Sequence, residues 1–243
     1  MASSIASSPV LIRCKGILFD MDGVLISSLG SVERSWTKWA NMRGVDPVYA
    51  CQVTHGCRSI ETIAKLRPDL DAEAENRIIE AIELQDTEGV TALPGVLKLL
   101  SALPKSRWTV VSSATEPIAR VRLAVAGIPI PDRIVTAETV SQGKPHPDPY
   151  LAGAALLSLA PEECVVFEDA ASGTKSARAA GCTVVATTFS HSIESLADAD
   201  YLIPDVTGVE VAILPGGEGL VLTFLPVEPR RGKNAGSNQN LQS

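Results

Sequence analysis

The sequence predicts an α/β protein: a doubly wound, Rossmann-like parallel sheet with an all-helical domain inserted after its first strand. Short apolar runs rich in β-branched residues alternate with helical patterns along most of the chain, which is typical of a parallel sheet covered on both faces. Between residues 28 and 90 the alternation stops and the pattern is helical throughout. The 243 residues are 45% hydrophobic, enough for a substantial core in one domain or two small ones.

Strands are expected where apolar residues follow one another without polar interruption, as in strands buried on both faces. The first such run is "GILFD", at 16–20. Five more strands are predicted, at 108–113, 133–137, 164–169, 182–188 and 200–204.

Helices are expected between these strands and throughout the insert. A proline or serine precedes or opens several of them and a glycine closes them, as at Pro117 and Gly127. The core helices are predicted at 96–103, 117–127, 148–159 and 172–181, and those of the insert at 31–44, 59–70 and 72–86.

This pattern divides the chain into a leader, an α/β core, a helical cap and a tail. A disordered leader is expected at 1–14, because it is rich in Ser and Ala and has neither a basic residue before Arg13 nor a long apolar run. A disordered tail is expected at 226–243, which is polar and rich in Pro, Gly and Asn. The α/β core is assigned to 15–27 and 91–225, and a helical cap to 28–90, with hinges near 27–30 and 91–94.

Charge and composition exclude several classes of partner. The formal net charge is −7 and there is no long basic block, so neither nucleic acid nor an anionic membrane surface is expected as a partner. No apolar run approaches the roughly 20 residues of a membrane-spanning helix. The five cysteines form no CxxC pair and suit a reducing compartment, so we expect a cytoplasmic protein, with a monomer as the simplest assembly.

Polar side chains follow the predicted strands where each strand ends. Because the carboxyl ends of parallel strands meet at one edge of a sheet, where ligands bind, we expect these side chains to converge. They are Asp20 and Asp22 after the first strand, Ser112 and Ser113 after the second, and Glu168 and Asp169 after the fourth, with Lys144 from the "GKPHPDPY" segment.

Phosphoryl transfer is the chemistry that uses such a set. Clustered carboxylates need a hard divalent cation with oxygen ligands, and Mg²⁺ fits best, bound by Asp20, Glu168 and Asp169. Asp20 is then the candidate nucleophile, and Asp22 the general acid and base. Lys144 offsets the negative charge, and the Ser112 hydroxyl holds phosphoryl oxygens.

Each motif taken alone also has an ordinary structural explanation. Asp-Gly is a common turn after a strand, Glu168 and Asp169 can cap the helix near Ser172, and Lys144 can be a surface lysine. All of them together, in this order and at strand ends, favour the functional interpretation.

These motifs resemble those of the haloacid dehalogenase superfamily of phosphatases and phosphomutases. "FDMDGVL" is similar to its nucleophile motif, "VVSSA" to its hydroxyl motif, "GKPHPDPY" to its lysine motif and "VVFEDAASGTKSARAAGC" to its acidic motif. The resemblance covers residues 15–225 and implies a type 1 helical cap at the insert. It also implies the site roles given above, with the backbone carbonyl of Asp22 as a further metal ligand.

Within the superfamily, the chain looks like the branch of polyol- and deoxysugar-phosphate phosphatases. "THGCRSIETIAKLRPDL" and "GKPHPDPYLAG" carry this closer resemblance. It implies that the cap loop with His55, Gly56 and Arg58 faces the active site and contacts substrate, together with Ser113. The alternative for Arg58 is a solvated arginine on the first turn of the following helix.

Three functions are therefore compared. The leading one is a Mg²⁺-dependent phosphatase that hydrolyses a small phosphorylated sugar or polyol through an aspartyl-phosphate. The second is a β-phosphoglucomutase-like phosphomutase, which Val24 after the Asp-Gly pair keeps open and the loop at His55 mildly disfavours. The third is a sugar-phosphate binding protein without turnover, which nothing supports because every catalytic position holds a competent residue.

Overall fold

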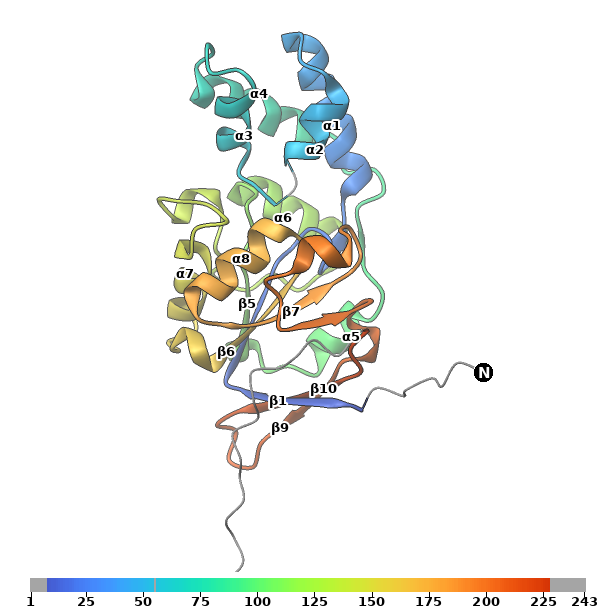
Figure 1. The fold of residues 1–243 in the computed structure, drawn as a ribbon, viewed down its shortest axis with the longest axis vertical. Coiled ribbons are helices and arrows are strands. Elements are labelled where there is room, and N and C mark those ends of the chain that lie inside the picture. Colours follow the sequence, from blue (N-terminus) through green and yellow to red (C-terminus); the bar gives the residue numbers. More distant parts are fainter. Residues whose placement is uncertain (1–7, 55, 228–243) are drawn as a thin grey trace, which may run out of the picture.

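The computed structural model describes residues 8–54 and 56–227, and a five-stranded parallel sheet forms its centre (Figure 1). The strand order is β5-β2-β6-β7-β8. Phe19 lies opposite both Val110 and Phe167, so the three adjacent strands β5, β2 and β6 reach the same edge of the sheet. The strands are β2 (Gly16–Phe19), β5 (Trp108–Val110), β6 (Cys164–Glu168), β7 (Thr183–Thr187) and β8 (Tyr201–Ile203). The predicted α/β fold with a parallel sheet is confirmed.

Helices cover both faces of this sheet, because successive side chains of a strand point to opposite faces. Ile17 and Phe19 pack in one apolar cluster with residues of α5 and α6, and Leu18 packs in the other with residues of α7 and α8. These helices are α5 (Val96–Ser101), α6 (Glu116–Val125), α7 (Asp148–Leu156) and α8 (Ala171–Ala180). Short 3-10 helices lie at η1 (Lys105–Arg107), η2 (Ala137–Thr139), η3 (Pro161–Glu163), η4 (Ile193–Leu196) and η5 (Val206–Gly208).

Four helices form a separate block at the upper end of the molecule (Figure 1). They are α1 (Leu29–Arg43), α2 (Pro47–Thr54), α3 (Ser59–Leu66) and α4 (Ala72–Gln85). The block has its own apolar cluster, in which the rings of Trp36 and Trp39 pack edge to face at 5.4 Å. The chain enters and leaves it through two antiparallel strands, β3 (Ile26–Ser27) and β4 (Thr91–Ala92). Both strands lie within or beside the segments where hinges are predicted.

A second, three-stranded antiparallel sheet was not predicted. It consists of β1 (Val10–Cys14), β10 (Leu220–Phe224) and β9 (Glu210–Ile213). The disordered leader predicted for 1–14 is therefore wrong for 10–14. The physical reason is alternation: Val10, Ile12 and Cys14 pack on the main apolar cluster, while Leu11 is exposed. The rest of the leader up to residue 7, and the tail from residue 228, lie outside the described residues.

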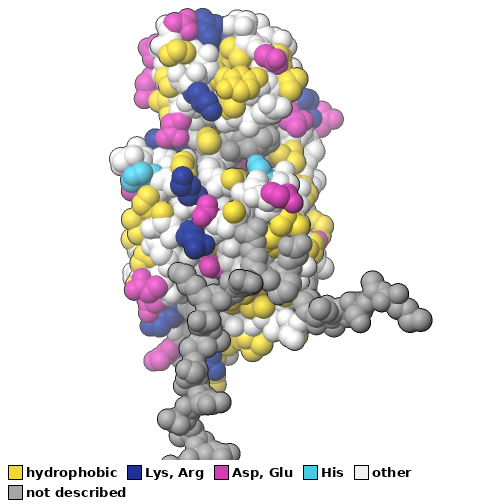
Figure 2. All heavy atoms as spheres, in the orientation of Figure 1, with side chains coloured by type: hydrophobic (Ala, Val, Ile, Leu, Met, Phe, Trp, Pro, Cys, Tyr) yellow, Lys and Arg dark blue, Asp and Glu magenta, His cyan; other side chains and the backbone are white. Residues whose placement is uncertain are grey.

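Two further elements differ from the sequence predictions. The strand expected at 133–137 is reduced to a single parallel bridge between Val111 and Val135. The helix α2 was missed because its eight residues carry little apolar periodicity. None of the helices in the described part of the chain is both long and apolar enough to cross a membrane. On the face shown in Figure 2, basic and acidic side chains are interspersed.

Candidate active site

A cavity of about 80 Å³ lies where the helical block meets the carboxyl ends of the sheet. Its walls come from both parts, with Trp36 from α1 and Ser112 after β5 as examples. Five of the residues that the sequence places at strand ends line it: Asp20, Asp22, Ser112, Ser113 and Asp169. The convergence expected from the parallel topology is present in the structure.

Lys144 contacts residues at the carboxyl ends of β2, β5 and β6. Its ammonium group donates to Asp20 Oδ1 at 2.5 Å, to Glu168 Oε1 at 2.7 Å and to the carbonyl oxygen of Val111 at 3.2 Å. An ammonium has three N–H donors, so all of them are used. Burial opposes the charge, but the carboxylates of Asp20 and Glu168 raise the pKa of Lys144 above its ordinary value. The lysine is therefore a buried cation, not a surface side chain.

Glu168 is held by four hydrogen-bond donors. Oε1 accepts from Lys144 and from the hydroxyl of Tyr150 at 2.8 Å, and Oε2 accepts from the backbone N–H groups of Asp169 at 2.8 Å and Ala170 at 2.9 Å. Burial raises the pKa of this carboxyl, but Lys144 outweighs burial and the net direction is down. Glu168 is therefore an anion that fixes Lys144 and the start of the loop after β6.

For Asp20 and Asp169, burial outweighs the compensating interactions. Burial raises the pKa of Asp20 to about 7, against the opposing charge of Lys144. Burial also raises the pKa of Asp169 well above its ordinary value, and the charges of Glu168 and Asp20 add to this effect. A bound cation would favour the ionised forms of these two adjacent carboxylates, so the raised pKa values fit a metal site.

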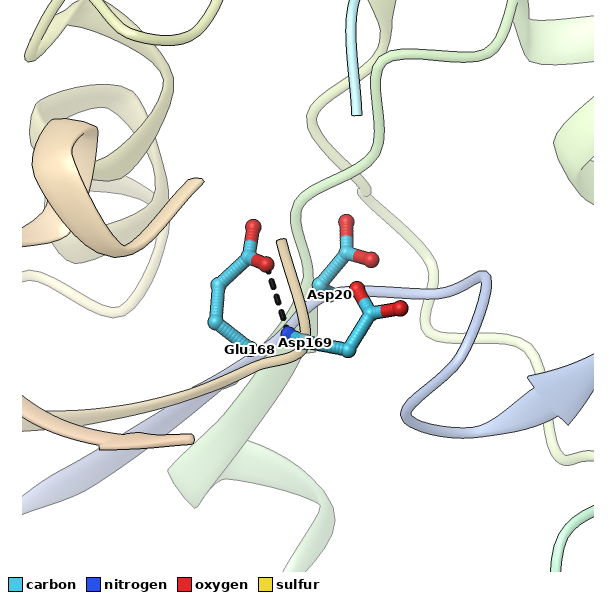
Figure 3. A group of neighbouring side chains, drawn as sticks. All are labelled: Asp20, Glu168 and Asp169. Atoms are coloured by element: carbon cyan, nitrogen blue, oxygen red, sulfur yellow. Dashed lines mark hydrogen bonds between the residues drawn. The ribbon is translucent and has the colours of Figure 1, made fainter. Parts of the chain in front are cut away.

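The geometry of this cluster fits a divalent cation. One carboxylate oxygen from each of Asp20, Glu168 and Asp169 lies within 4.8 Å of the others. Figure 3 shows the carboxylates of Asp20 and Asp169 close together, with Glu168 turned toward the backbone N–H of Asp169. Because the Glu168 oxygens already accept four hydrogen bonds, Asp20 and Asp169 are the better direct ligands of an ion such as Mg²⁺.

The Asp22 side chain contacts Ser28, just before α1, and Arg122 of α6. Its Oδ1 accepts from the Ser28 hydroxyl and from Nη1 of Arg122 at 3.3 Å. The turn that follows Asp22 requires Gly23, which has φ +82°. A Cβ at Gly23 would lie 1.9 Å from Asp169 Oδ2. The glycine therefore lets the two acidic loops approach each other.

The loop between α2 and α3 reaches the core at Gly56. The hydroxyls of Ser113 and Ser172 both donate to the Gly56 carbonyl, at 3.1 and 3.2 Å. Gly56 also lines the cavity, whereas His55 lies outside the described residues. The Ser112 hydroxyl accepts from the backbone N–H of Ala114 at 3.1 Å.

Arg58, which was expected to contact substrate, is not among the described residues that line the cavity. Its guanidinium donates to Glu61 and to the carbonyls of Ala137, Val140 and Ser141, so it bridges the helical block and the core beside the cavity. The cause is local, because the first turn of α3 places Glu61 three residues after Arg58. The side chain is 14% exposed, so it is not the solvated arginine of the alternative either.

Sequence reasoning missed several residues of the site. Tyr150 lies within the lysine motif, but nothing in the sequence shows that its hydroxyl reaches Glu168. Ser190 donates to Asp169 from the loop after β7, and Glu83 and Arg122 line the cavity from α4 and α6. These contacts join segments far apart in the chain, and no local pattern marks them.

Gly173 offers a direct test of the role of Glu168. A Cβ at this position would lie 1.6 Å from Glu168 Oε1, so the Gly173→Ala substitution must displace the carboxylate from its four donors. We expect turnover to fall about 100-fold or more, because small misplacements of catalytic groups are costly. The matched control is Gly208→Ala, where an added Cβ meets nothing within 4 Å. Equal activity of the two variants would contradict the role given to Glu168.

Comparison with known proteins identifies relatives over most of the chain. Residues 17–187 match the family described as haloacid dehalogenase-like hydrolase. Hexitol phosphatase A of Escherichia coli (strain K12) is 43% identical over 214 residues, covering 86% of this chain and 99% of the relative. Glycerol-1-phosphate phosphohydrolase 2 of Saccharomyces cerevisiae is 33% identical over 221 residues, covering 85% of this chain and 88% of the relative.

Solved structures agree on the fold. The crystal structure of β-phosphoglucomutase from Clostridium difficile matches with a TM-score of 0.70 over 80% of this chain and 92% of its own. At 21% identity this likeness concerns the fold alone.

Proposed function

We propose that this chain, which belongs to the haloacid dehalogenase-like hydrolase family, is a Mg²⁺-dependent phosphatase of a small phosphorylated sugar or polyol. The observation that carries the proposal is the position of Asp20. Lys144 holds one of its carboxylate oxygens, and the residue lines the cavity beside Asp169. The named activities of the relatives, which are phosphatases of polyols and sugars, supply the substrate class.

The reaction proceeds through the side chains in two steps. Asp20 attacks phosphorus with the oxygen that Lys144 does not hold, the bond to the substrate oxygen breaks, and Asp22 gives that oxygen a proton. Asp22 then takes a proton from a water molecule that attacks the aspartyl-phosphate and releases phosphate. The Ser112 hydroxyl and backbone N–H groups hold the phosphoryl oxygens. Lys144 favours the ionised form of Asp20 against the effect of burial and holds its side chain in place.

Asp20 and Asp169 are the side chains that would hold Mg²⁺, with the Asp22 carbonyl and Glu168 as the further ligands implied by the family resemblance. The ion supplies positive charge to the phosphoryl oxygens and to the crowded carboxylates. Removing the ion with a chelator tests whether the reaction requires it.

We propose that the helical block, residues 28–90, acts as a cap over the carboxyl ends of the strands. Gly56 of the cap and Ser113 of the core lie where the two parts meet. A closed cap excludes bulk water and admits a small metabolite, which disfavours phosphoproteins and nucleic acid as substrates. The five cysteines are all unpaired, which favours the cytoplasmic location that we propose for a monomer.

Two alternatives are weaker. A phosphomutase would share Asp20 and Asp22 but return the phosphoryl group to another hydroxyl, and the likeness to β-phosphoglucomutase reaches only the fold. A binding protein without turnover would need no nucleophile held by a buried lysine.

The test is phosphate release from a panel of sugar and polyol phosphates, with Mg²⁺ and with EDTA. We expect release with Mg²⁺, a loss of about 100-fold or more with EDTA, and recovery when excess Mg²⁺ is added back. Analysis of the same samples for isomerised sugar phosphate separates a phosphatase from a mutase. Release that is unaffected by EDTA would contradict the proposed metal requirement.

A further inference from the structure

A buried carboxylate and a buried guanidinium lie together on the wall of the same cavity. Glu83 comes from α4 in the helical block and Arg122 from α6 in the core. They are 6% and 4% exposed, and both line the cavity. Glu83 Oε1 and Arg122 Nη2 lie 3.5 Å apart. One residue of the pair therefore comes from the helical block and the other from the core.

Much of the hydrogen-bonding capacity of this pair is unused. Nη1 of Arg122 donates to Asp22, but Nε and Nη2 have no hydrogen-bond acceptor among residues 8–54 and 56–227. Within the same ranges, Arg122 is the one cation within 4 Å of the Glu83 carboxylate. Burial raises the pKa of Glu83, and Arg122 opposes that shift. Buried polar groups are rarely left unpaired, so these atoms point to a ligand.

The arrangement selects the chemistry of that ligand. A hydroxyl group donates one hydrogen bond and accepts others, so one hydroxyl can donate to Glu83 and accept from Arg122. A carboxylate or a second phosphate donates nothing and would lie against Glu83 and Asp22. Arg122 is also the one Lys or Arg among the described residues of the cavity wall, and two carboxylates already flank it.

We propose that Glu83 and Arg122 bind a hydroxyl of the substrate, so that the site selects phosphate esters with a neutral polyhydroxy chain and rejects those with a second anionic group. This inference rests on the proposed phosphatase function, because it requires a phosphate ester in the cavity. It also makes a bisphosphate, the intermediate that a phosphomutase must rebind, a poor ligand here.

The experiment compares three esters of equal carbon number. Glycerol 1-phosphate has two hydroxyls, n-propyl phosphate has none, and 3-phosphoglycerate has a carboxylate; p-nitrophenyl phosphate serves as a reference without a polyol. We expect kcat/KM of the unmodified protein to be about 10- to 100-fold higher for glycerol 1-phosphate than for n-propyl phosphate. We expect 3-phosphoglycerate to be a poor substrate.

The Glu83→Gln substitution keeps the shape of the side chain and removes its charge. We expect the ratio of kcat/KM for glycerol 1-phosphate to kcat/KM for n-propyl phosphate to fall about tenfold, mainly through KM for glycerol 1-phosphate. Activity on 3-phosphoglycerate should rise. The control is Glu73→Gln on the exposed side of the same helix, which should leave all ratios unchanged.

The outcomes distinguish failure of this inference from failure of the proposed phosphatase function. An equal fall for all four esters in Glu83→Gln would show a structural role and overturn the inference. Equal activity of the unmodified protein on glycerol 1-phosphate and n-propyl phosphate would overturn it as well. No hydrolysis of any ester, p-nitrophenyl phosphate included, would instead overturn the phosphatase function and the inference that rests on it.

Discussion

Replacing Asp20 with asparagine is expected to lower phosphate release by on the order of 10⁴-fold or more, because an amide cannot attack phosphorus as a carboxylate does. The fold should survive the change. Burial raises the pKa of Asp20, which means that the folded protein disfavours its charge, and Lys144 retains Glu168 as a partner in the variant. The melting temperature of Asp20→Asn should therefore equal or exceed that of the unmodified protein. The measurement is phosphate release with a thermal melt on the same samples.

The control for this prediction is an exposed aspartate, Asp69→Asn, which lies in the helical block away from the cavity wall. It should keep full activity. Substantial turnover by Asp20→Asn would contradict the nucleophilic role. Loss of activity together with unfolding would not contradict it. The thermal melt distinguishes that case from the loss of a nucleophile in an intact fold.

Replacing Lys144 with methionine is expected to damage both stability and turnover. The substitution leaves Asp20 and Glu168 buried without their shared cation, and breaking a buried ion pair from one side costs about 3–5 kcal/mol. We expect the free energy of unfolding to fall by about that amount and phosphate release to fall about 1000-fold or more. Denaturant unfolding curves and kinetics measure the two effects.

A double variant tests the physical reason. Adding Asp20→Asn to Lys144→Met removes one of the two stranded carboxylates, so part of the lost stability should return. The control Lys105→Met changes an exposed lysine and should alter neither stability nor turnover. A double variant less stable than Lys144→Met alone would contradict the electrostatic explanation.

The central sheet could be predicted from the sequence because its strands are continuous apolar runs that each end in polar residues. That pattern placed Asp20, Ser112 and Asp169 at one edge, and the structure brings them to one cavity. The antiparallel sheet could not be predicted in the same way. Val10–Cys14 is interrupted by a charged residue, Arg13, and its partner Leu220–Phe224 lies near the other end of the chain.

The walls of the cavity were predictable only in part. Gly56, expected to contact substrate, lines the cavity, whereas Arg58 two residues later donates to Glu61 and to backbone carbonyls. Glu83 and Arg122 look like ordinary charges on amphipathic helices, and only the packing of α4 on α6 shows that both are buried. Specificity residues of this kind depend on tertiary contacts, which leave no local pattern in the sequence.

The most direct test of the account is to trap the intermediate. The protein is mixed with a polyol phosphate carrying a radiolabelled phosphoryl group in the presence of Mg²⁺, quenched in acid within one turnover, and digested for peptide mapping. We expect a labelled peptide that contains Asp20, and no label in Asp20→Asn. Phosphate release without label in the protein, or label on a residue other than Asp20, would contradict the account.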